Sequence, residues 1–189
     1  MQQIDLFGEN LVQKHKISRL EKSLMNYDKN SFDFRLERLK TLKKIFPKGL
    51  LIAGDLEFIF TIEEAESCFI SGNYLATLVL IQSFIEKVFN EYYQRKGLNS
   101  VAKKGLEQMI NYARKNKIIN TLLLDKVESI RLKRNAIIHS KTQEYPHSIS
   151  NRMIKLGTFT QPYKLLEKDA IEAFQTMILL GRLDFLNQK

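Results

Sequence analysis

The sequence of 189 residues contains a single cysteine, no tryptophan and three prolines. The lone Cys68 excludes a disulfide within the chain and fits a reducing compartment. It also leaves too few thiols for a cysteine-based set of zinc ligands. The chain lacks an H-E-x-x-H, a G-x-S-x-G and a glycine-rich phosphate-binding motif, which mark several large enzyme classes. We therefore expect neither a cofactor nor a metal site.

Long apolar runs are also missing. No stretch approaches the roughly 20 apolar residues that a membrane-spanning helix requires. Residues 1–5 lack the basic and apolar regions of a secretory signal peptide. These features predict a cytoplasmic protein with no membrane partner.

Positive charge is in clear excess. The 30 Lys and Arg residues against 21 Asp and Glu give a net charge of +9, and the pI is near 9.5. This balance favours an anionic partner, and nucleic acid rather than membrane because no amphipathic tail stands out. A general solubility charge is the alternative. The hydrophobic content of 44% and charged content of 27% are typical of one soluble globular domain with a true core.

Hydrophobic residues recur at helical spacing along most of the chain, without sustained alternation. The spacing predicts helices over 13–47, 55–70, 74–96, 102–115, 120–139 and 167–186. Residues 30–33 supply turn and capping residues inside the first of these ranges, and 97–100 are expected to form a loop. The predicted fold class is therefore an all-α helical bundle, and a sheet-based enzyme is not expected.

Three parts are expected along the chain. They are a flexible N-terminal peptide over 1–12, a basic helical extension over 13–54 and the helical bundle over 55–189. The basic residues of the extension either track a phosphate backbone or form a solvated helix face. Residues 141–166 form a long polar segment, and we expect it either to border a substrate cleft or to be an ordinary surface connection. His147 within this segment is interpreted as a loop residue.

Charged and polar side chains gather near the end of the fifth predicted helix. Arg131, Lys133 and Arg134 precede Asn135, and His139 follows one helical turn after Asn135 on the same face. Histidine moves protons near neutral pH, and the guanidinium fork matches the negative charge that a phosphate gathers in its transition state. These residue types fit cleavage of RNA by its own 2′-OH, with the asparagine orienting the histidine or the phosphate. Alternatively, the cations form a solvated face and the histidine caps the helix.

Arg134-Asn135-x-x-x-His139 resembles the R-x4-6-H signature of the HEPN superfamily, in which a polar residue usually follows the arginine. Residues 64–86 are similar to the first helix pair of HEPN-type domains. The resemblance covers about 59–186 and implies a HEPN-like bundle. It also implies a homodimer joined through the signature helices, so that two copies of the motif face one cleft.

Many HEPN members are metal-independent endoribonucleases, and others are inactive helical modules. The resemblance implies Arg134, Asn135 and His139 as catalytic residues. The neighbouring cations are the candidate nucleic-acid-binding residues: Arg131, Lys133 and Lys141.

The expected function is cleavage of RNA to 2′,3′-cyclic phosphate and 5′-OH ends. The family makes a toxin or phage-defence effector plausible, with a cognate antitoxin or partner protein. The alternative is a non-catalytic helical dimer that binds a protein or nucleic acid. The Arg134-Asn135-x-x-x-His139 motif favours the endoribonuclease over the non-catalytic dimer.

Gln3-Ile4-Asp5-Leu6-Phe7 is similar to the short peptide by which many bacterial proteins dock on the DNA polymerase sliding clamp. Leu6 and Phe7 would enter an apolar pocket, and Gln3 would donate and accept hydrogen bonds beside it. The alternative is that the apolar residues of this peptide pack back onto the bundle.

Overall fold

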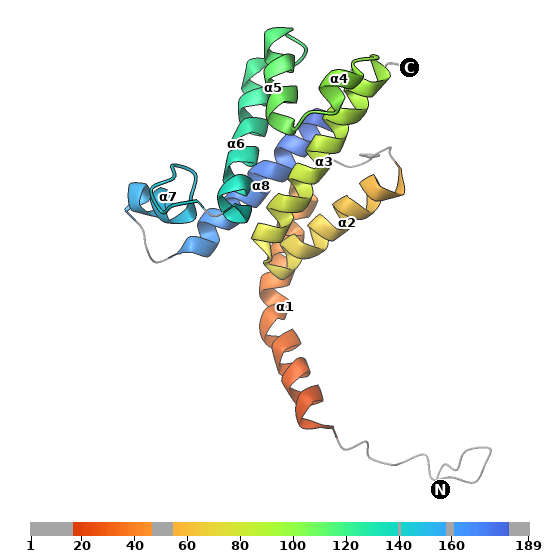
Figure 1. Ribbon diagram of the computed structural model, residues 1–189. Helices are drawn as coiled ribbons and strands as arrows, with labels where there is room; N and C mark the ends of the chain where they lie inside the picture. Colours follow the sequence, from red (N-terminus) through yellow and green to blue (C-terminus); the bar gives the residue numbers. More distant parts are fainter. Residues whose placement is uncertain (1–16, 47–54, 140, 158–160, 182–189) are drawn as a thin grey trace, which may run out of the picture.

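The computed structural model describes residues 17–46, 55–139, 141–157 and 161–181 (Figure 1). Every regular element within these ranges is a helix, which confirms the all-α class. The helices are α1 (Arg19–Ile45), α2 (Leu56–Ser71), α3 (Tyr74–Arg95), α4 (Asn99–Ala102), α5 (Leu106–Lys115), α6 (Thr121–Ile138), α7 (Ile149–Leu156) and α8 (Pro162–Gly181). No helix in the described ranges is long and apolar enough to cross a membrane.

The central helix of the bundle is α3, and α2, α6 and α8 pack against it (Figure 1). Ten of its residues are buried, because its apolar residues surround much of the helix rather than forming one stripe. Phe69 of α2 and Phe174 of α8 meet edge to face at 5.7 Å beside it. Full burial of one such large apolar side chain stabilises a fold by about 1.5–3 kcal/mol, so these contacts hold the helices together.

Side chains and glycines mark the ends of several helices. Asp55, Asn120 and Ser148 each accept a hydrogen bond from the backbone N–H three residues later, at 2.9, 2.8 and 3.1 Å. These bonds satisfy amides that have no partner within a helix. Gly72 ends α2 with φ of 83°, a left-handed conformation that glycine adopts without a steric penalty.

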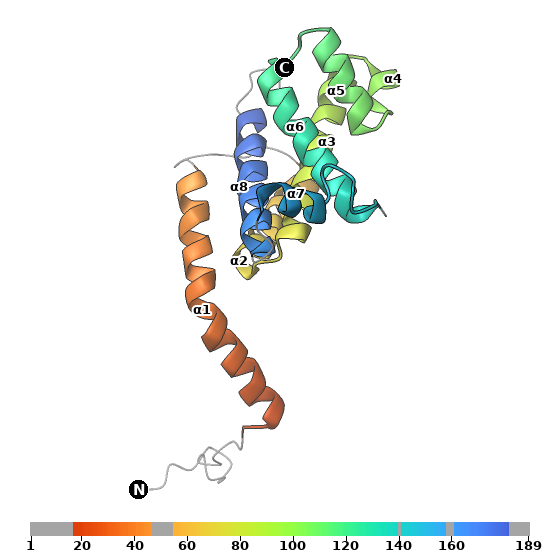
Figure 2. The same ribbon diagram turned by 90° about the vertical axis from the view of Figure 1, so that its left-hand side faces the viewer.

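The first helix is continuous, and the turn expected at residues 30–33 was wrong. Those residues include neither glycine nor proline, so none of them forces a break. Local side-chain bonds accommodate them instead: the Ser31 hydroxyl donates to the carbonyl of Asp28 at 3.2 Å, and Arg35 donates to the same carbonyl at 3.3 Å. The helix α1 therefore runs past the bundle, and its N-terminal half projects away from it in both views (Figures 1 and 2).

The C-terminal end of α1 belongs to the packed core. Leu42 is 2% exposed, and the ring of Phe46 meets Phe174 edge to face at 5.6 Å. Arg38 donates from Nε to the Tyr74 hydroxyl at 2.9 Å. The division at residues 54 and 55 stays a prediction, but residues 38–46 share the core of the helices that follow.

Two helical segments interrupt the polar stretch that was expected to be irregular over 141–166. Ser148 caps α7, which ends at Gly157 in a left-handed conformation, and α8 begins at Pro162 rather than at residue 167. Proline is well suited to the first turn of a helix, where its missing N–H has no partner to lose. A short helix, α4, also lies where a loop was expected over 97–100.

Candidate functional site

The signature residues lie at the C-terminal end of α6. Leu123, Leu124, Val127 and Ile130 are its buried residues, and beyond Ile130 the helix is only half-buried. Its apolar stripe therefore holds the first part of α6 in the bundle while its last two turns approach the surface.

His139 follows the last helical residue and is exposed. Its backbone is extended, with φ of −98° and ψ of 137°, and its N–H donates to the carbonyl of Asn135 at 3.1 Å. Within the described ranges, its imidazole forms no hydrogen bond or ion pair. The imidazole is thus positioned at the surface by the end of the helix, as a capping residue would be.

Arg134 is half-buried, on the same helix face as Val127 and Ile130. Its Nη1 donates to Oδ1 of Asn135 at 3.2 Å. Its Nε is shielded from solvent and has no hydrogen-bond partner in the described part of the chain. A shielded donor without an acceptor is unfavourable by about 1–3 kcal/mol, so the end of α6 holds this guanidinium with one of its hydrogen bonds unmade.

The structure thus joins two of the three predicted catalytic side chains directly. Arg134 and Asn135 share a hydrogen bond, whereas His139 is linked to Asn135 through the backbone alone. No side-chain hydrogen bond links His139 to either residue in the described part of the molecule.

Arg131 is engaged in ion pairs with two glutamates. Its Nε and Nη2 donate to the carboxylate of Glu128 at 2.9 and 2.7 Å, and its Nη1 lies 3.0 Å from Glu107 of α5. The hydrogen bonds to Glu128 raise the pKa of Arg131 despite its partial burial. This side chain therefore ties α5 to α6, and its predicted role in nucleic-acid binding stays a prediction.

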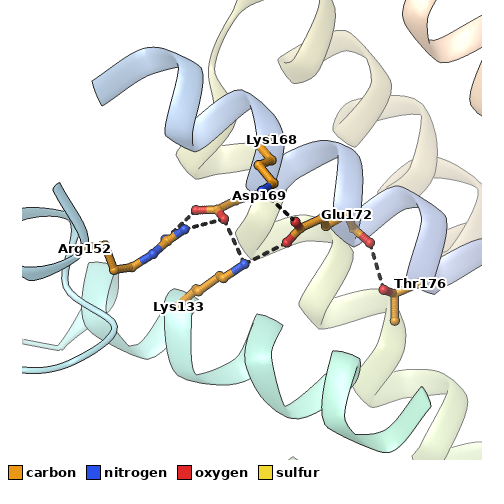
Figure 3. Close-up of polar contacts among 6 residues, drawn as sticks. All are labelled: Lys133, Arg152, Lys168, Asp169, Glu172 and Thr176. Carbon is orange, nitrogen blue, oxygen red and sulfur yellow. Dashed lines mark hydrogen bonds and ion pairs between the residues drawn. The ribbon is translucent and has the colours of Figure 1, made fainter. Parts of the chain in front are cut away.

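Lys133 belongs to a network of ion pairs centred on Asp169 of α8 (Figure 3). Asp169 is 2% exposed and accepts two hydrogen bonds from Arg152 of α7, at 2.5 and 2.6 Å. The Lys133 ammonium lies 2.8 Å from Asp169 and 2.9 Å from Glu172. The buried carboxylate thereby joins α6, α7 and α8, and most of the Lys133 charge is offset within the fold.

The segment after α6 brings aromatic and cationic groups together. The ammonium of Lys141, which is exposed, lies 5.6 Å from the ring centroid of Tyr145, and that ring lies 5.6 Å from the ring of His147. Burial lowers the pKa of His147, and the positive charges of Arg152 and Lys133 lower it further. The imidazole of His147 therefore lies within electrostatic range of the network around Asp169.

Sequence reasoning missed this network. Asp169 and Arg152 lie 17 residues apart on different helices, and no local spacing connects either of them with Lys133. The remaining candidates, Gln3, Leu6 and Phe7 of the clamp-like peptide, lie outside the described residues.

Among the described residues, no group of three or more His, Cys, Asp and Glu side chains is arranged to hold a metal ion.

Comparison of the chain with known proteins gives no matching family model, no matching curated protein and no matching solved structure.

Proposed function

We propose that this protein is an endoribonuclease that cleaves RNA by attack of a 2′-OH on the neighbouring phosphorus. The observation that carries the proposal is the end of α6. Arg134 there has a shielded donor without an acceptor, and an exposed imidazole follows five residues later. Residues 134 and 138 lie about 6 Å apart along the helix axis, and His139 follows on extended backbone, so a phosphodiester with its two riboses is long enough to reach both side chains.

The reaction requires one proton to leave and one to arrive. The 2′ oxygen forms a bond to phosphorus as the bond from phosphorus to the 5′ oxygen breaks. The proton of the 2′-OH goes to an imidazole acting as base, and an imidazolium gives a proton to the departing 5′ oxygen. The products are a 2′,3′-cyclic phosphate and a 5′-OH, without net consumption of water.

Each signature side chain has one role in this proposal. His139 exchanges the protons, and Arg134 donates hydrogen bonds to the phosphate oxygens as they gain charge. Asn135, already bonded to Arg134, holds the guanidinium in place. In a homodimer joined through α6, the histidine of each copy supplies one of the two proton transfers.

The proposal assigns phosphate contact to Arg134 and not to Arg131 or Lys133. The latter two are held by Glu128, Glu107 and Asp169, so a phosphate would have to displace these carboxylates. A buried ion pair that loses one partner leaves an uncompensated charge. Exposed Lys141 supplies a further cation near the site.

The first prediction is cleavage of mixed RNA by the purified protein in the presence of EDTA. The wild type cuts, His139→Ala is inactive, and Arg134→Lys is about 100-fold slower, because an ammonium lacks the two-pronged fork. A matched histidine control, His15→Ala, keeps the wild-type rate. The measurement is gel analysis of labelled RNA, with end-group analysis for the cyclic phosphate and the 5′-OH.

The second candidate function is a non-catalytic helical module that binds a protein or nucleic acid. It is favoured by the ion pairs of Arg131 and Lys133, which give the cations of α6 a role in the fold. If wild type and His139→Ala both leave every RNA intact, the protein is a binding module and not an endoribonuclease. A toxin or phage-defence setting, an antitoxin and docking on a sliding clamp stay predictions.

A further inference from the structure

The N-terminal half of α1 exposes a large apolar surface. Nine large apolar residues of this helix and its N-terminal flank are between 36% and 83% exposed. They are Ile17, Leu20, Leu24, Met25, Tyr27, Phe32, Phe34, Leu36 and Leu39. The helix spans 27 residues, or about 40 Å, and only its C-terminal end packs against α2 and α8 (Figures 1 and 2).

Six positions of this half follow the alternating spacing of three and four residues that defines a helix-pairing seam. They are Ile17, Leu20, Leu24, Tyr27, Ser31 and Phe34. The same face continues into Arg38, whose guanidinium bonds the Tyr74 hydroxyl and the Ile70 carbonyl. Tyr74 in turn lines an apolar hollow of about 540 Å³ with Leu75 and Tyr163. The exposed seam therefore continues an interface that α1 already makes with the bundle.

A projecting helix of this kind gains stability from a partner that covers its apolar face. Isolated helices of fewer than about 12–15 residues are marginal in water, and most helical stability comes from packing of an apolar face. In the described part of the chain, no other helix covers the seam.

The charges of this half match a second copy of the same helix. Residues 17–34 carry three basic and three acidic side chains, so they are neutral overall. Residues 35–46 carry five basic side chains and one acidic. An antiparallel pair superimposes the two neutral halves and keeps the two basic ends apart, which limits repulsion.

We propose that two copies of this protein associate through an antiparallel pair of α1 helices. A two-fold axis crosses the seam between residues 25 and 26, because each large apolar side chain there then meets a seam residue of the other copy. The layers are Ile17 with Phe34, Leu20 with Ser31, and Leu24 with Tyr27, each occurring twice. This inference does not depend on ribonuclease activity.

The first test is sedimentation equilibrium of the full chain at about 1–100 µM, where a small interface dissociates. Leu24→Glu places two carboxylates in the seam and weakens the dimer by about 100-fold or more. Asn26→Glu is the matched control: it adds the same charge two residues away, on the opposite helix face, and leaves the dimer intact. Circular dichroism verifies that both variants keep the helical content of the wild type.

Three results would overturn the proposal. A wild type that is monomeric throughout the range has no such interface. A Leu24→Glu variant that keeps the molar mass of the wild type at every concentration associates elsewhere, as a dimer joined through α6 would. Equal weakening by Leu24→Glu and Asn26→Glu reflects general charge rather than the seam. RNA cleavage by the same variants is measured separately, so failure of one proposal is distinguishable from failure of the other.

The second test concerns the direction of the two helices, in a Cys68→Ser background that removes the single native thiol. The antiparallel layers place residue 20 of one copy against residue 31 of the other. A mixture of Leu20→Cys and Ser31→Cys chains of different mass therefore oxidises to the mixed dimer. Leu20→Cys alone stays uncrosslinked. Rapid crosslinking of Leu20→Cys alone indicates a parallel pair and overturns the arrangement.

Discussion

At the scale of single residues, the environment of a charge decides its role more than its position in the sequence. Arg134 and Lys133 are neighbours on α6, yet one retains an unpartnered shielded donor and the other contacts two carboxylates. The difference arises because α8 faces Lys133 with an acidic surface. A cluster of cations in a sequence therefore overstates the charge available to a phosphate.

Asp169 is expected to be the most costly charge in this network to remove. Asp169→Asn leaves the guanidinium of Arg152 without its carboxylate in a half-buried site, and we expect a loss of about 3 kcal/mol in the free energy of unfolding. Urea denaturation measures this loss. Glu172→Gln is the control, because Glu172 is 44% exposed and its ion pairs should contribute less than about 1 kcal/mol. Equal losses for the two variants would contradict the central role of Asp169.

His147 makes stability depend on pH in a defined direction. Its folded pKa is below the ordinary value of 6.5, so between the two values the unfolded chain binds a proton that the folded chain does not. Stability therefore rises with pH through this window and falls as the pH drops below about 6.5. His147→Asn should flatten the dependence of the urea midpoint between about pH 5 and 7. An unchanged slope would show that other groups cause it.

At the scale of elements, local spacing predicted α2, α3 and α6 well and the short helices poorly. The ranges 55–70 and 74–96 agree closely with α2 and α3, since each carries enough buried residues to reveal its period. Helices α4 and α7 have only four and eight residues, too few for a period to stand out. The turn expected inside α1 was wrong because polar residues favour a break without requiring one.

The turn between α2 and α3 offers a test of an individual glycine. A Cβ on Gly72 would lie 3.0 Å from Cζ and Nη1 of Arg38, and the residue has a positive φ. Gly72→Ala should therefore add backbone strain and displace Arg38 from Tyr74. We expect the free energy of unfolding to fall by about 2–3 kcal/mol, measured by thermal or urea denaturation.

Gly157→Ala is the matched control for this substitution. Gly157 also has a positive φ, of 64°, but among the described residues beyond its chain neighbours no atom lies within 4 Å of its added Cβ. Gly157→Ala should therefore lower the free energy of unfolding only by the added backbone strain, about 1–2 kcal/mol. The prediction fails if the two variants are destabilised equally.

At the scale of the whole molecule, α1 has two different environments. Its C-terminal end completes the core beside α2 and α8, whereas its N-terminal half projects from the bundle (Figure 2). The same helix therefore connects the packed bundle to the surface that we propose for association.

Leu42→Ala tests whether the end of α1 belongs to the cooperative unit. Because Leu42 is 2% exposed, its truncation should destabilise the whole chain by about 2–5 kcal/mol in a single unfolding transition. Leu39→Ala is the control: Leu39 is 37% exposed, so its truncation should lower the free energy of unfolding clearly less. If Leu42→Ala leaves the main transition unchanged, residues 55–189 fold as a unit without α1.

The sequence by itself determined the helical class, the bounds of α2, α3 and α6, and the place of Arg134, Asn135 and His139 at a helix end. These properties depend on spacing within about 20 residues, which a periodic pattern records directly. The tertiary structure alone decided which cations are neutralised, because Asp169 and Glu107 reach α6 from other helices. It also decided which face of α1 is left uncovered, since burial depends on neighbours that no local pattern specifies.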